Sequence, residues 1–363
     1  MDKNSNNNFF YMREALNLAK KGLGFVSPNP CVGAVLVKDD LIIGQGYHAQ
    51  AGDDHAEVIA INEAGSLAKD AYLFVTLEPC NHHGKTPPCA ELIVKSGIKK
   101  VFISCKDNNP LVSGRGIEYL KSNNVEVDLG MLENEAIALN QGFFHRMKEK
   151  KPYIKIKIAS SLDGNTSLKT GESKWITSEH SRDDVQKLRA QSCAILSGVG
   201  TVNSDNPKLN VRGRNYDKQP KRFILDSHLS IKSNLEILQQ ENVFIVYGDD
   251  PNNNLSKLKN IKAKLIQMPQ KNNRIDLSYV ISYFNKFGIN NLLVEAGPTL
   301  SGAMIESGFF NDLIIYIAPV LLGSEANNLI KLTQIKTMKQ RINFSYKDIR
   351  SIGSDIRITL ESM

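Results

Sequence analysis

The stretch TLEPCNHHGKTPPC, residues 76–89, read together with HAE at residues 55–57, decides how the first part of this chain is interpreted. It contains two cysteines, Cys80 and Cys89, and His55 precedes both. Thiolate and imidazole are ligands that Zn²⁺ prefers, and three protein ligands leave the fourth tetrahedral position open for a water. Glu57 adds a carboxylate that can carry protons to and from such a water. The pattern predicts a catalytic zinc site.

The surrounding residues predict alternating strands and helices. Pro79 ends a strand pattern, so Cys80 should begin the loop that follows. His55 and Glu57 should lie in the first turn of a helix, where the helix dipole favours a thiolate or hydroxide. Together these elements predict an α/β sandwich with the site beyond the strand ends. Strands are expected at residues 32–37, 41–46, 72–77 and 100–105, and helices at 9–19, 55–64, 89–96 and 134–147.

A His-x-Glu followed by Pro-Cys and a further Cys is the zinc deaminase signature, in which the Glu is not a ligand. It is accompanied by SPNPCVGAVLV (27–37), GYH (46–48), GDDHAE (52–57) and DNNPLVSGRG (107–116). The set resembles the deaminase half of the bifunctional riboflavin-biosynthesis deaminase/reductase, whose domain is a cytidine-deaminase-like three-layer α/β/α sandwich. The resemblance implies zinc ligands at His55, Cys80 and Cys89, a proton shuttle at Glu57, and substrate contacts at Asn29, His48, Lys85 and Thr86.

Other interpretations of these residues remain open. A structural zinc would need a fourth ligand, and His82 or His83 lies within the loop, but structural sites usually show short paired spacings. His48 also fits a hydrogen-bonded structural histidine, and Asn29 an ordinary turn. Lys85 stands where this family is expected to have arginine, so the charge is kept but a bidentate phosphate contact is not.

A second domain is predicted to follow the charged run KEKKP (148–152), which is typical of a linker. The domains are therefore placed at residues 1–148 and 149–363. Residues 153–159 alternate isoleucine with lysine and predict a strand. In VEAGPTLSGA (294–303) a strand enters a glycine turn with proline as the first helical residue, and main-chain amides there can bind a pyrophosphate. Ser197–Gly200 matches a dinucleotide fingerprint only in part, because Asn203 replaces its third glycine.

Four stretches of the second domain resemble the reductase half of the same enzyme. They are IASSLDGNTS (158–167), TGESKWITS (170–178), residues 188–212 and VEAGPTLSGA (294–303). That half has a dihydrofolate-reductase-like α/β fold and uses NADPH. Asp163 fits either a polar active-site group or a turn, and Trp175 either a cofactor contact or a core residue. The implied cofactor contacts are Ala159, Trp175, Thr201, Asp205, Ser227, Gly297, Pro298, Thr299, Leu300, Ser301, Gly302 and Ala303. The implied substrate contacts are Ser173, Arg189, Leu209, Arg212 and Glu295.

The resemblance implies two consecutive reactions in riboflavin biosynthesis. The first is a zinc-dependent hydrolytic deamination of 2,5-diamino-6-ribosylamino-4(3H)-pyrimidinone 5′-phosphate. The second is an NADPH-dependent reduction of the ribosyl side chain, which gives 5-amino-6-ribitylamino-uracil 5′-phosphate. Arg189 and Arg212 are plausible phosphate contacts, and Glu295 can bind ribose hydroxyls. No residue of the second domain stands out as the acid for the hydride step.

Composition sets broader bounds. With 363 residues, 41% hydrophobic and 23% charged, the chain is expected to be a globular protein of two domains. The five cysteines and the absence of an apolar signal or membrane-spanning run favour the cytoplasm. We expect a phosphorylated pyrimidine as the substrate and a homo-oligomer, dimer or tetramer, without membrane or nucleic-acid partners.

Because the net charge is +7, functions that involve nucleic-acid binding are considered as alternatives. One alternative is a nucleic-acid deaminase with an unrelated C-terminal extension. The long insert of eight residues between Cys80 and Cys89 argues against it. Another is a non-catalytic RNA-binding module with structural zinc, and a third is an enzyme with only one active half. Because the basic residues are spread along the chain and not interleaved with aromatics, solvated surfaces explain them better.

Overall fold

The computed structural model describes residues 3–81, 88–107, 113–213 and 219–363. The chain divides into two compact units, Met1–Lys150 and Lys151–Met363. The boundary expected from the sequence, between residues 148 and 149, falls close to this division. Each unit is described below by itself.

The first unit is built on a five-stranded sheet with the order β2-β1-β3-β4-β5. The β1–β2 and β1–β3 pairs are antiparallel, whereas β3–β4 and β4–β5 are parallel. The strands are β1 (Gly33–Lys38), β2 (Leu41–Tyr47), β3 (Tyr72–Leu77), β4 (Lys100–Cys105) and β5 (Glu126–Leu129). The helices are α1 (Lys3–Lys20), α2 (Ala56–Ala64), α3 (Cys89–Lys95), α4 (Arg115–Ser122), α5 (Glu133–Leu139) and α6 (Gln141–Glu149), with a 3₁₀ turn η1 (Gly65–Ala68).

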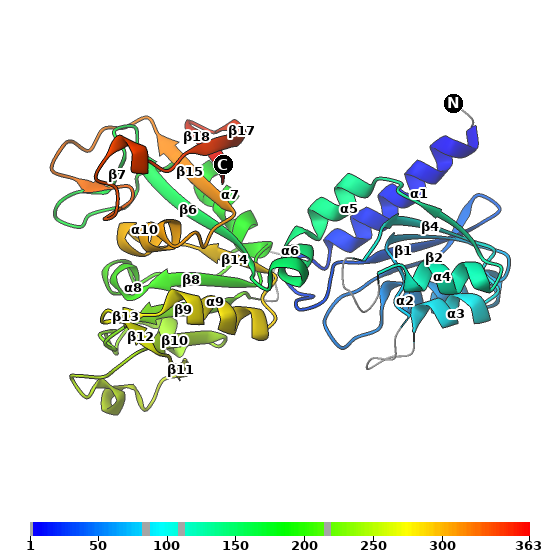
Figure 1. Ribbon diagram of the computed structural model, residues 1–363, viewed down its shortest axis with the longest axis horizontal. Helices are drawn as coiled ribbons and strands as arrows, with labels where there is room; N and C mark the ends of the chain where they lie inside the picture. The colour runs from blue at the N-terminus through cyan, green and yellow to red at the C-terminus, as the bar shows by residue number, and fades with distance from the viewer. Residues whose placement is uncertain (1–2, 82–87, 108–112, 214–218) are drawn as a thin grey trace. The chain divides into compact units, whose positions relative to one another are not determined.

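Successive side chains of a strand point to opposite faces, and both faces of this sheet are apolar. Val35 and Phe74 pack with Met12 of α1, whereas Ala34 and Leu73 belong to the cluster that includes α2, α3 and α4. Figure 1 shows α1 and α5 on one side of the sheet and α2, α3 and α4 on the other. The predicted three-layer α/β/α sandwich is confirmed.

Two glycines of β2 let α2 lie unusually close to the sheet. A Cβ at Gly46 would fall 2.2 Å from the carbonyl oxygen of Ala56, and one at Gly44 would fall 2.1 Å from that of Ala60. Neither position tolerates a side chain without movement of helix main chain. This contact therefore fixes where the first turn of α2 lies.

The predicted helix over residues 134–147 is wrong as a single element. Two helices, α5 and α6, are separated at Asn140, whose side-chain amide accepts from Cys31 N (2.7 Å) and donates to Cys31 O (2.9 Å). This buried asparagine satisfies a main-chain pair of another loop, and it has φ −104° and ψ 17° between the two helices. Helix α4 and strand β5 were not predicted; both are short, and β5 is mostly exposed.

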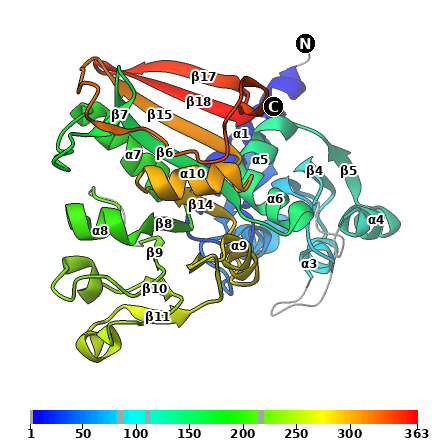
Figure 2. The same cartoon turned by 60° about the vertical axis from the view of Figure 1, so that its left-hand side comes forward.

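The second unit contains a nine-stranded sheet with the order β11-β10-β9-β8-β14-β6-β15-β18-β17. Figure 2 shows this order from β17 at the top to β11 at the bottom. The strands of this sheet are β6 (Tyr153–Ser161), β8 (Ala194–Gly198), β9 (Lys221–Asp226), β10 (Val243–Tyr247), β11 (Lys264–Gln267), β14 (Asn291–Val294), β15 (Asp312–Ala318), β17 (Phe344–Ile352) and β18 (Asp355–Ser362). Two small ribbons pair β7 (Asn165–Ser167) with β16 (Asn327–Asn328) and β12 (Gln270–Lys271) with β13 (Arg274–Ile275).

The strands from β11 to β15 run parallel, and only β18 and β17 are antiparallel to their neighbours. Helices cover both faces, with α9 and α10 contributing to one apolar cluster and α7 and α8 to another. In such a sheet ligands bind beyond the carboxyl ends of the strands. The helices are α7 (Glu179–Ala190), α8 (Val199–Asp205), α9 (Leu277–Lys286) and α10 (Pro298–Glu306), and the 3₁₀ turns are η2 (Glu236–Gln239), η3 (Asn254–Leu258) and η4 (Met338–Gln340).

Within the described ranges, the helices are all too short or too polar to cross a membrane.

Replacing Gly46 with alanine tests the close packing of α2. Because the new Cβ would overlap the main chain of Ala56, we expect the free energy of unfolding of the first unit to fall by about 2 kcal/mol or more. Denaturant unfolding followed by circular dichroism measures this. Gly200→Ala is the matched control, since Gly200 lies in α8 with no atom near its Cβ position, and it should leave stability equal or slightly higher. Equal stability of Gly46→Ala and wild type would contradict the packing argument.

Candidate active sites

Three side chains from separate elements meet at one end of the first sheet. His55 is the N-cap of α2, Cys80 follows β3, and Cys89 is the first residue of α3. Their ligand atoms all lie within 4.8 Å of one another. His55 Nδ1 is 3.2 Å from Cys89 Sγ and 3.6 Å from Cys80 Sγ. One imidazole and two thiols at these separations suit a tetrahedral zinc ion and leave one position for a water.

Main-chain contacts hold the two cysteines together. Ala90 N donates to Cys80 O (3.1 Å), and Cys89 N lies 3.4 Å from Cys80 Sγ. The hydrogen bond from the Cys89 thiol lowers the pKa of Cys80 to about 4, although burial opposes this shift, and the same contact raises the pKa of Cys89. One thiol of the pair is therefore already disposed to ionise, which is the state in which cysteine binds a metal.

Glu57 lies in the first turn of α2 and is buried, with 3% of its surface exposed. Its Oε2 atom has no hydrogen-bond partner within the part of the chain that the structure describes. Burial raises the pKa of Glu57 to about 7, against the opposing effect of His55. A buried carboxylate oxygen without a partner is costly unless a ligand or water completes it. Its presence next to the three metal-binding side chains fits a zinc site with a bound water.

Asn29 and His48 lie next to this centre. His48 Nδ1 donates to Asp54 O (3.1 Å), which leaves Nε2 to accept from Asn29 Nδ2 (2.9 Å). Burial lowers the pKa of His48 and so favours its neutral form. The ring also makes an edge contact with that of His55, with centroids 5.4 Å apart. The two predicted substrate contacts are thus brought together beside the metal ligands, and the structural role considered for His48 is present as well.

Glu78 was not singled out from the sequence, yet it fixes the position of the motif. The buried carboxylate accepts from four main-chain N–H groups, those of Asp107 (3.3 Å), Gly114 (3.0 Å), Gly116 (3.0 Å) and Ile117 (3.3 Å). This ties the start of α4 to the chain two residues before Cys80. The predicted substrate residues Lys85 and Thr86, and the alternative ligands His82 and His83, lie outside the described residues.

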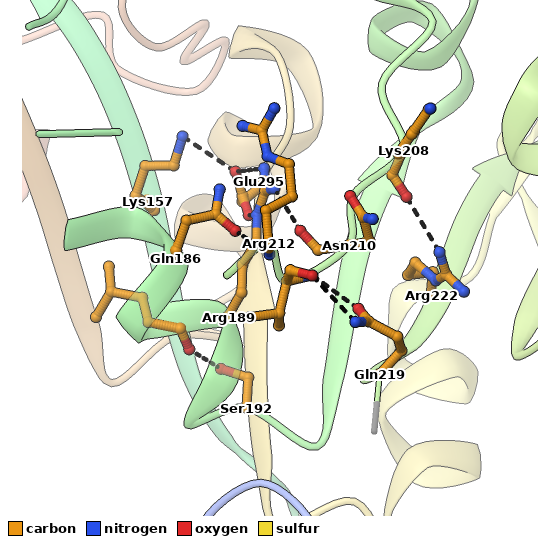
Figure 3. Close-up of polar contacts among 12 residues, drawn as sticks. Lys157, Gln186, Arg189, Ser192, Lys208, Asn210, Arg212, Gln219, Arg222 and Glu295 are labelled. Carbon is orange, nitrogen blue, oxygen red and sulfur yellow. Dashed lines mark hydrogen bonds and ion pairs between the residues drawn. The ribbon is translucent and has the colours of Figure 1, made fainter. Parts of the chain in front are cut away.

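In the second unit, a buried carboxylate with two cations stands at the end of β14. Glu295 is 7% exposed, and its oxygens accept from Arg189 Nε (2.5 Å) and Nη2 (3.0 Å) and from Lys157 Nζ (3.2 Å). Figure 3 shows these contacts. Burial alone would raise the pKa of Glu295, but the charges of Arg189 and Lys157 outweigh it and lower the pKa to about 2. Glu295 is therefore ionised at neutral pH.

The glycine turn lies next to this carboxylate. Gly297 is the N-cap of α10, with Pro298 at its first turn, and Gly297 N donates to Thr201 Oγ1 (3.0 Å). Further along the helix, Ser301 and Gly302 are buried, and a Cβ at Gly302 would fall 2.0 Å from Lys331 O. The early residues of the predicted pyrophosphate site, with Thr299 and Leu300, are thus more accessible than the later ones.

The other predicted contacts of the second unit lie mainly near strand ends. Ala159 is near the end of β6, Ser227 follows β9, and Asp205 ends α8 with its carbonyl oxygen accepting from Lys174 Nζ (3.1 Å). Ser173 is half-buried, Ala303 is half-buried on α10, and Arg212 is exposed, whereas the Leu209 side chain is buried in the core. Any contact of Leu209 with a ligand would therefore use its main chain.

Position bears on two interpretations that the sequence left open. Trp175 is 67% exposed with the Arg182 guanidinium 4.6 Å from its ring centroid, so the alternative of a core residue is wrong. Asp163 accepts from Ser161 Oγ (2.5 Å), Leu322 N (3.1 Å) and Gly323 N (2.8 Å), which favours its turn role. Lys157 was missed, because the alternation of isoleucine and lysine in β6 indicates a solvent-facing side, whereas the structure places this lysine largely buried beside Glu295.

Comparison with known proteins matches both units. The family model for the cytidine and deoxycytidylate deaminase zinc-binding region matches residues 5–105, and that for the RibD C-terminal domain matches residues 152–358. The latter covers more than half of the chain. This chain belongs to the RibD family.

Individual RibD proteins are similar over nearly the whole chain. The riboflavin biosynthesis protein RibD of Bacillus amyloliquefaciens is 44% identical over 96% of this chain and 95% of its own length. That of Escherichia coli (strain K12) is 41% identical over 97% and 98%. A solved structure of Acinetobacter baumannii RibD is 40% identical and covers 99% of both chains with a TM-score of 0.88.

A bifunctional enzyme from Thermotoga maritima is 31% identical, with a TM-score of 0.85 and 99% of both chains covered. Its title describes a diaminohydroxyphosphoribosylaminopyrimidine deaminase/5-amino-6-(5-phosphoribosylamino)uracil reductase. As a member of the RibD family, the present chain is a bifunctional deaminase and reductase of riboflavin biosynthesis, and its cofactors are zinc and NADPH. The predicted family and fold class are confirmed.

Cys80→Ala tests the ligand set. Removing one thiolate leaves two ligands, so we expect the zinc content to fall from about one ion per chain to well below a tenth after dialysis. Atomic absorption on the purified protein measures it. Cys193→Ala is the control, because Cys193 is buried in the other unit and should not change zinc content. Full zinc occupancy in Cys80→Ala would exclude Cys80 as a ligand.

Arg189→Met tests the charges around Glu295. Leaving this carboxylate with Lys157 alone should cost about 3 kcal/mol of unfolding free energy at pH 7. In the wild type, Glu295 stabilises the fold above its ordinary pKa of 4.5, and this contribution is lost as pH falls towards 2. The variant should lose that acid dependence because the pKa of Glu295 rises.

Calorimetry of the second unit's transition at pH 7 and at pH 3 measures both effects. Lys169→Met removes an exposed ion pair with Glu325 (2.7 Å) and should change stability by less than about 1 kcal/mol. An Arg189→Met protein as stable as the control at pH 7 would show that the buried pair is not stabilised as described.

Proposed function

We propose that the first unit hydrolytically deaminates 2,5-diamino-6-ribosylamino-4(3H)-pyrimidinone 5′-phosphate. The second unit then reduces the ribosyl side chain with NADPH to give 5-amino-6-ribitylamino-uracil 5′-phosphate. The observation that best supports the proposal is the buried Oε2 of Glu57, which lies beside His55, Cys80 and Cys89 and has no hydrogen-bond partner among the residues that the structure describes. A carboxylate in that position is suited to proton transfer and is not needed by a closed structural metal site. The activities named for the Thermotoga maritima relative agree with this assignment.

In the first unit, His55, Cys80 and Cys89 would hold the metal. Bound zinc supplies a Lewis acid that lowers the pKa of a water ligand. Glu57 accepts a proton from the attacking water and passes it to the departing amino group, so that ammonia leaves. Its burial keeps bulk water from competing for the proton.

Asn29 and His48 orient the pyrimidine ring. Their mutual hydrogen bond and the contact of His48 with Asp54 O fix both polar groups beside the ligand His55. Lys85 and Thr86, which lie outside the described residues, are assigned to the sugar phosphate on the basis of the sequence motif alone.

In the second unit, NADPH supplies the hydride, and the protein aligns donor and acceptor. The residues assigned to cofactor binding are Gly297–Ala303, Thr201, Ser227, Ala159, Asp205 and Trp175. Glu295 accepts hydrogen bonds from ribose hydroxyls, and Arg189 and Lys157 hold it ionised and in place.

Arg212 is assigned to the phosphate of the second substrate. Within the described residues its guanidinium makes no hydrogen bond or ion pair, and the residue is exposed. Arg189 already uses three of its five N–H groups, on Glu295 and on Asn210 O, so it is less free to bind the phosphate. Ser173 and the Leu209 main chain complete the assigned substrate contacts.

The enzyme is proposed to work as a homo-oligomer, a dimer or tetramer, in the cytoplasm, with no nucleic-acid or membrane partner. Two large side chains exposed on the edge strand β17, Tyr346 and Ile349, support self-association. The five free cysteines and the thiol metal site suit a reducing compartment.

Glu57→Gln tests the deaminase assignment. The substitution keeps the size of the side chain but removes its ability to accept a proton, so ammonia release should fall by at least about a hundred-fold. Zinc content should stay at the wild-type level because Glu57 is not a ligand.

The same chain provides the control. NADPH oxidation with the already deaminated substrate should be unchanged in Glu57→Gln, since that reaction takes place in the other unit. Ammonia release at the wild-type rate would exclude the proton-transfer role of Glu57, whereas loss of both activities would point to a folding defect. Wild-type protein that shows neither ammonia release nor NADPH oxidation would contradict the proposed function as a whole.

A further inference from the structure

The segment Lys208–Arg212 lies between α8 and β9 in the chain and has no regular secondary structure, yet side chains from elsewhere hold its main chain (Figure 3). Arg222 Nη1 donates to Lys208 O (3.2 Å), and Arg189 Nη1 donates to Asn210 O (3.0 Å). Loops are ordinarily tied down by a few local contacts and vary in conformation. The number of side-chain contacts to the main chain of Lys208–Arg212 indicates that a specific conformation of this segment is needed.

Gln219 forms a two-point contact with the segment. Its Oε1 accepts from Val211 N (2.7 Å), and its Nε2 donates to Val211 O (3.0 Å). A neutral amide is the side chain that can serve both groups, because a carboxylate only accepts and an ammonium only donates. The contact fixes the peptide units on either side of Val211.

Gln186 fixes the next residue from the opposite direction. Its Oε1 accepts from Arg212 N (2.9 Å), and it lies one helical turn before Arg189 on α7. Residues three apart share a helix face, so α7 reaches the segment through both side chains. Arg189 also pairs with Glu295. Helix α7 therefore links the main chain of Arg212 to the carboxylate of the proposed substrate site.

The segment needs this support because its conformation is not the one it would adopt alone. Leu209 has φ +49°, a left-handed conformation that costs a non-glycine residue about 1–2 kcal/mol. The Leu209 and Val211 side chains are each 4% exposed, whereas Arg212 is exposed. The buried side chains of Leu209 and Val211 anchor the segment in the core. The side-chain amides of Gln186 and Gln219 fix the main chain from which the Arg212 side chain extends.

We propose that Gln219 and Gln186 are positioning residues of the reductase, which hold the main chain so that Arg212 meets the phosphate monoester of the second substrate. The proposal rests on the assignment of Arg212 to that phosphate. Both glutamines act through Arg212 and touch neither substrate nor cofactor.

The test uses full-length zinc-loaded enzyme and two forms of the deaminated substrate, with and without its 5′-phosphate. Gln219→Glu still accepts from Val211 N but sets a carboxylate against Val211 O. For the phosphorylated form we expect KM to rise about ten-fold and kcat to stay within about two-fold of wild type. For the dephosphorylated form KM should not change. Deamination by the same chain and the Kd for NADPH should also stay at wild-type values.

A double-mutant cycle with Arg212→Ala decides whether the effect passes through Arg212. If it does, adding Gln219→Glu to Arg212→Ala should raise KM no further. Gln186→Met removes only the acceptor for Arg212 N and should behave in the same way, which keeps the test valid if Gln219→Glu does not fold. Gln239→Met is the matched control, since Gln239 is exposed, bonds Asn260 O (3.3 Å) and should leave both KM values unchanged.

Equal increases of KM for the two substrate forms, or additive effects in the cycle, would overturn the positioning role while leaving the Arg212 assignment intact. A wild-type KM for the phosphorylated form in Arg212→Ala would overturn the assignment of Arg212 and the positioning role together. The deaminase and NADPH assignments would survive either result.

Discussion

The first active site depends on the close approach of α2 to β2. Gly44 and Gly46 leave no side chain between strand and helix, so the carbonyl oxygens of Ala60 and Ala56 lie only 2.1 and 2.2 Å from where a Cβ would be. This contact fixes the start of the helix, and His55 and Glu57 are there. Cys80 reaches the same point from the end of β3. The metal-binding group is therefore assembled by sheet geometry and main-chain packing, together with the Glu78 carboxylate that ties the Cys80 loop to the start of α4.

The second active site depends on a different principle, the neutralisation of a buried charge. Glu295 is acceptable in the interior because Arg189 and Lys157 surround it, and these come from α7 and β6. A buried carboxylate with one cation removed is strongly unfavourable, so the three elements must keep their relative positions. The need to neutralise Glu295 holds α7, β6 and β14 together. The same need keeps an ionised carboxylate, a hydrogen-bond acceptor, at the end of β14.

Much of this was accessible from the sequence because it depends on local pattern. The strands with both faces covered, such as β4 and β15, are continuous apolar runs, and the zinc motif combines residue types that rarely coincide. Elements set by long-range contacts were not accessible. Asn140 breaks a helix in order to bond Cys31, and β17, an edge strand with many exposed residues, has no clear alternation. Gln219 bonds the main chain of Val211, and nothing in an isolated glutamine indicates such a partner.

Trp175, the only tryptophan in the chain, has a spectroscopic consequence. It is exposed and lies under the Arg182 guanidinium, in a stretch assigned to the cofactor. Its emission therefore reports on the second unit alone when tryptophan is excited selectively, since the first unit contains none. The reduced nicotinamide absorbs in the range where indole emits, so a bound dinucleotide would quench this single fluorophore by energy transfer. The enzyme thus contains its own optical reporter for one of its two reactions, without any added label.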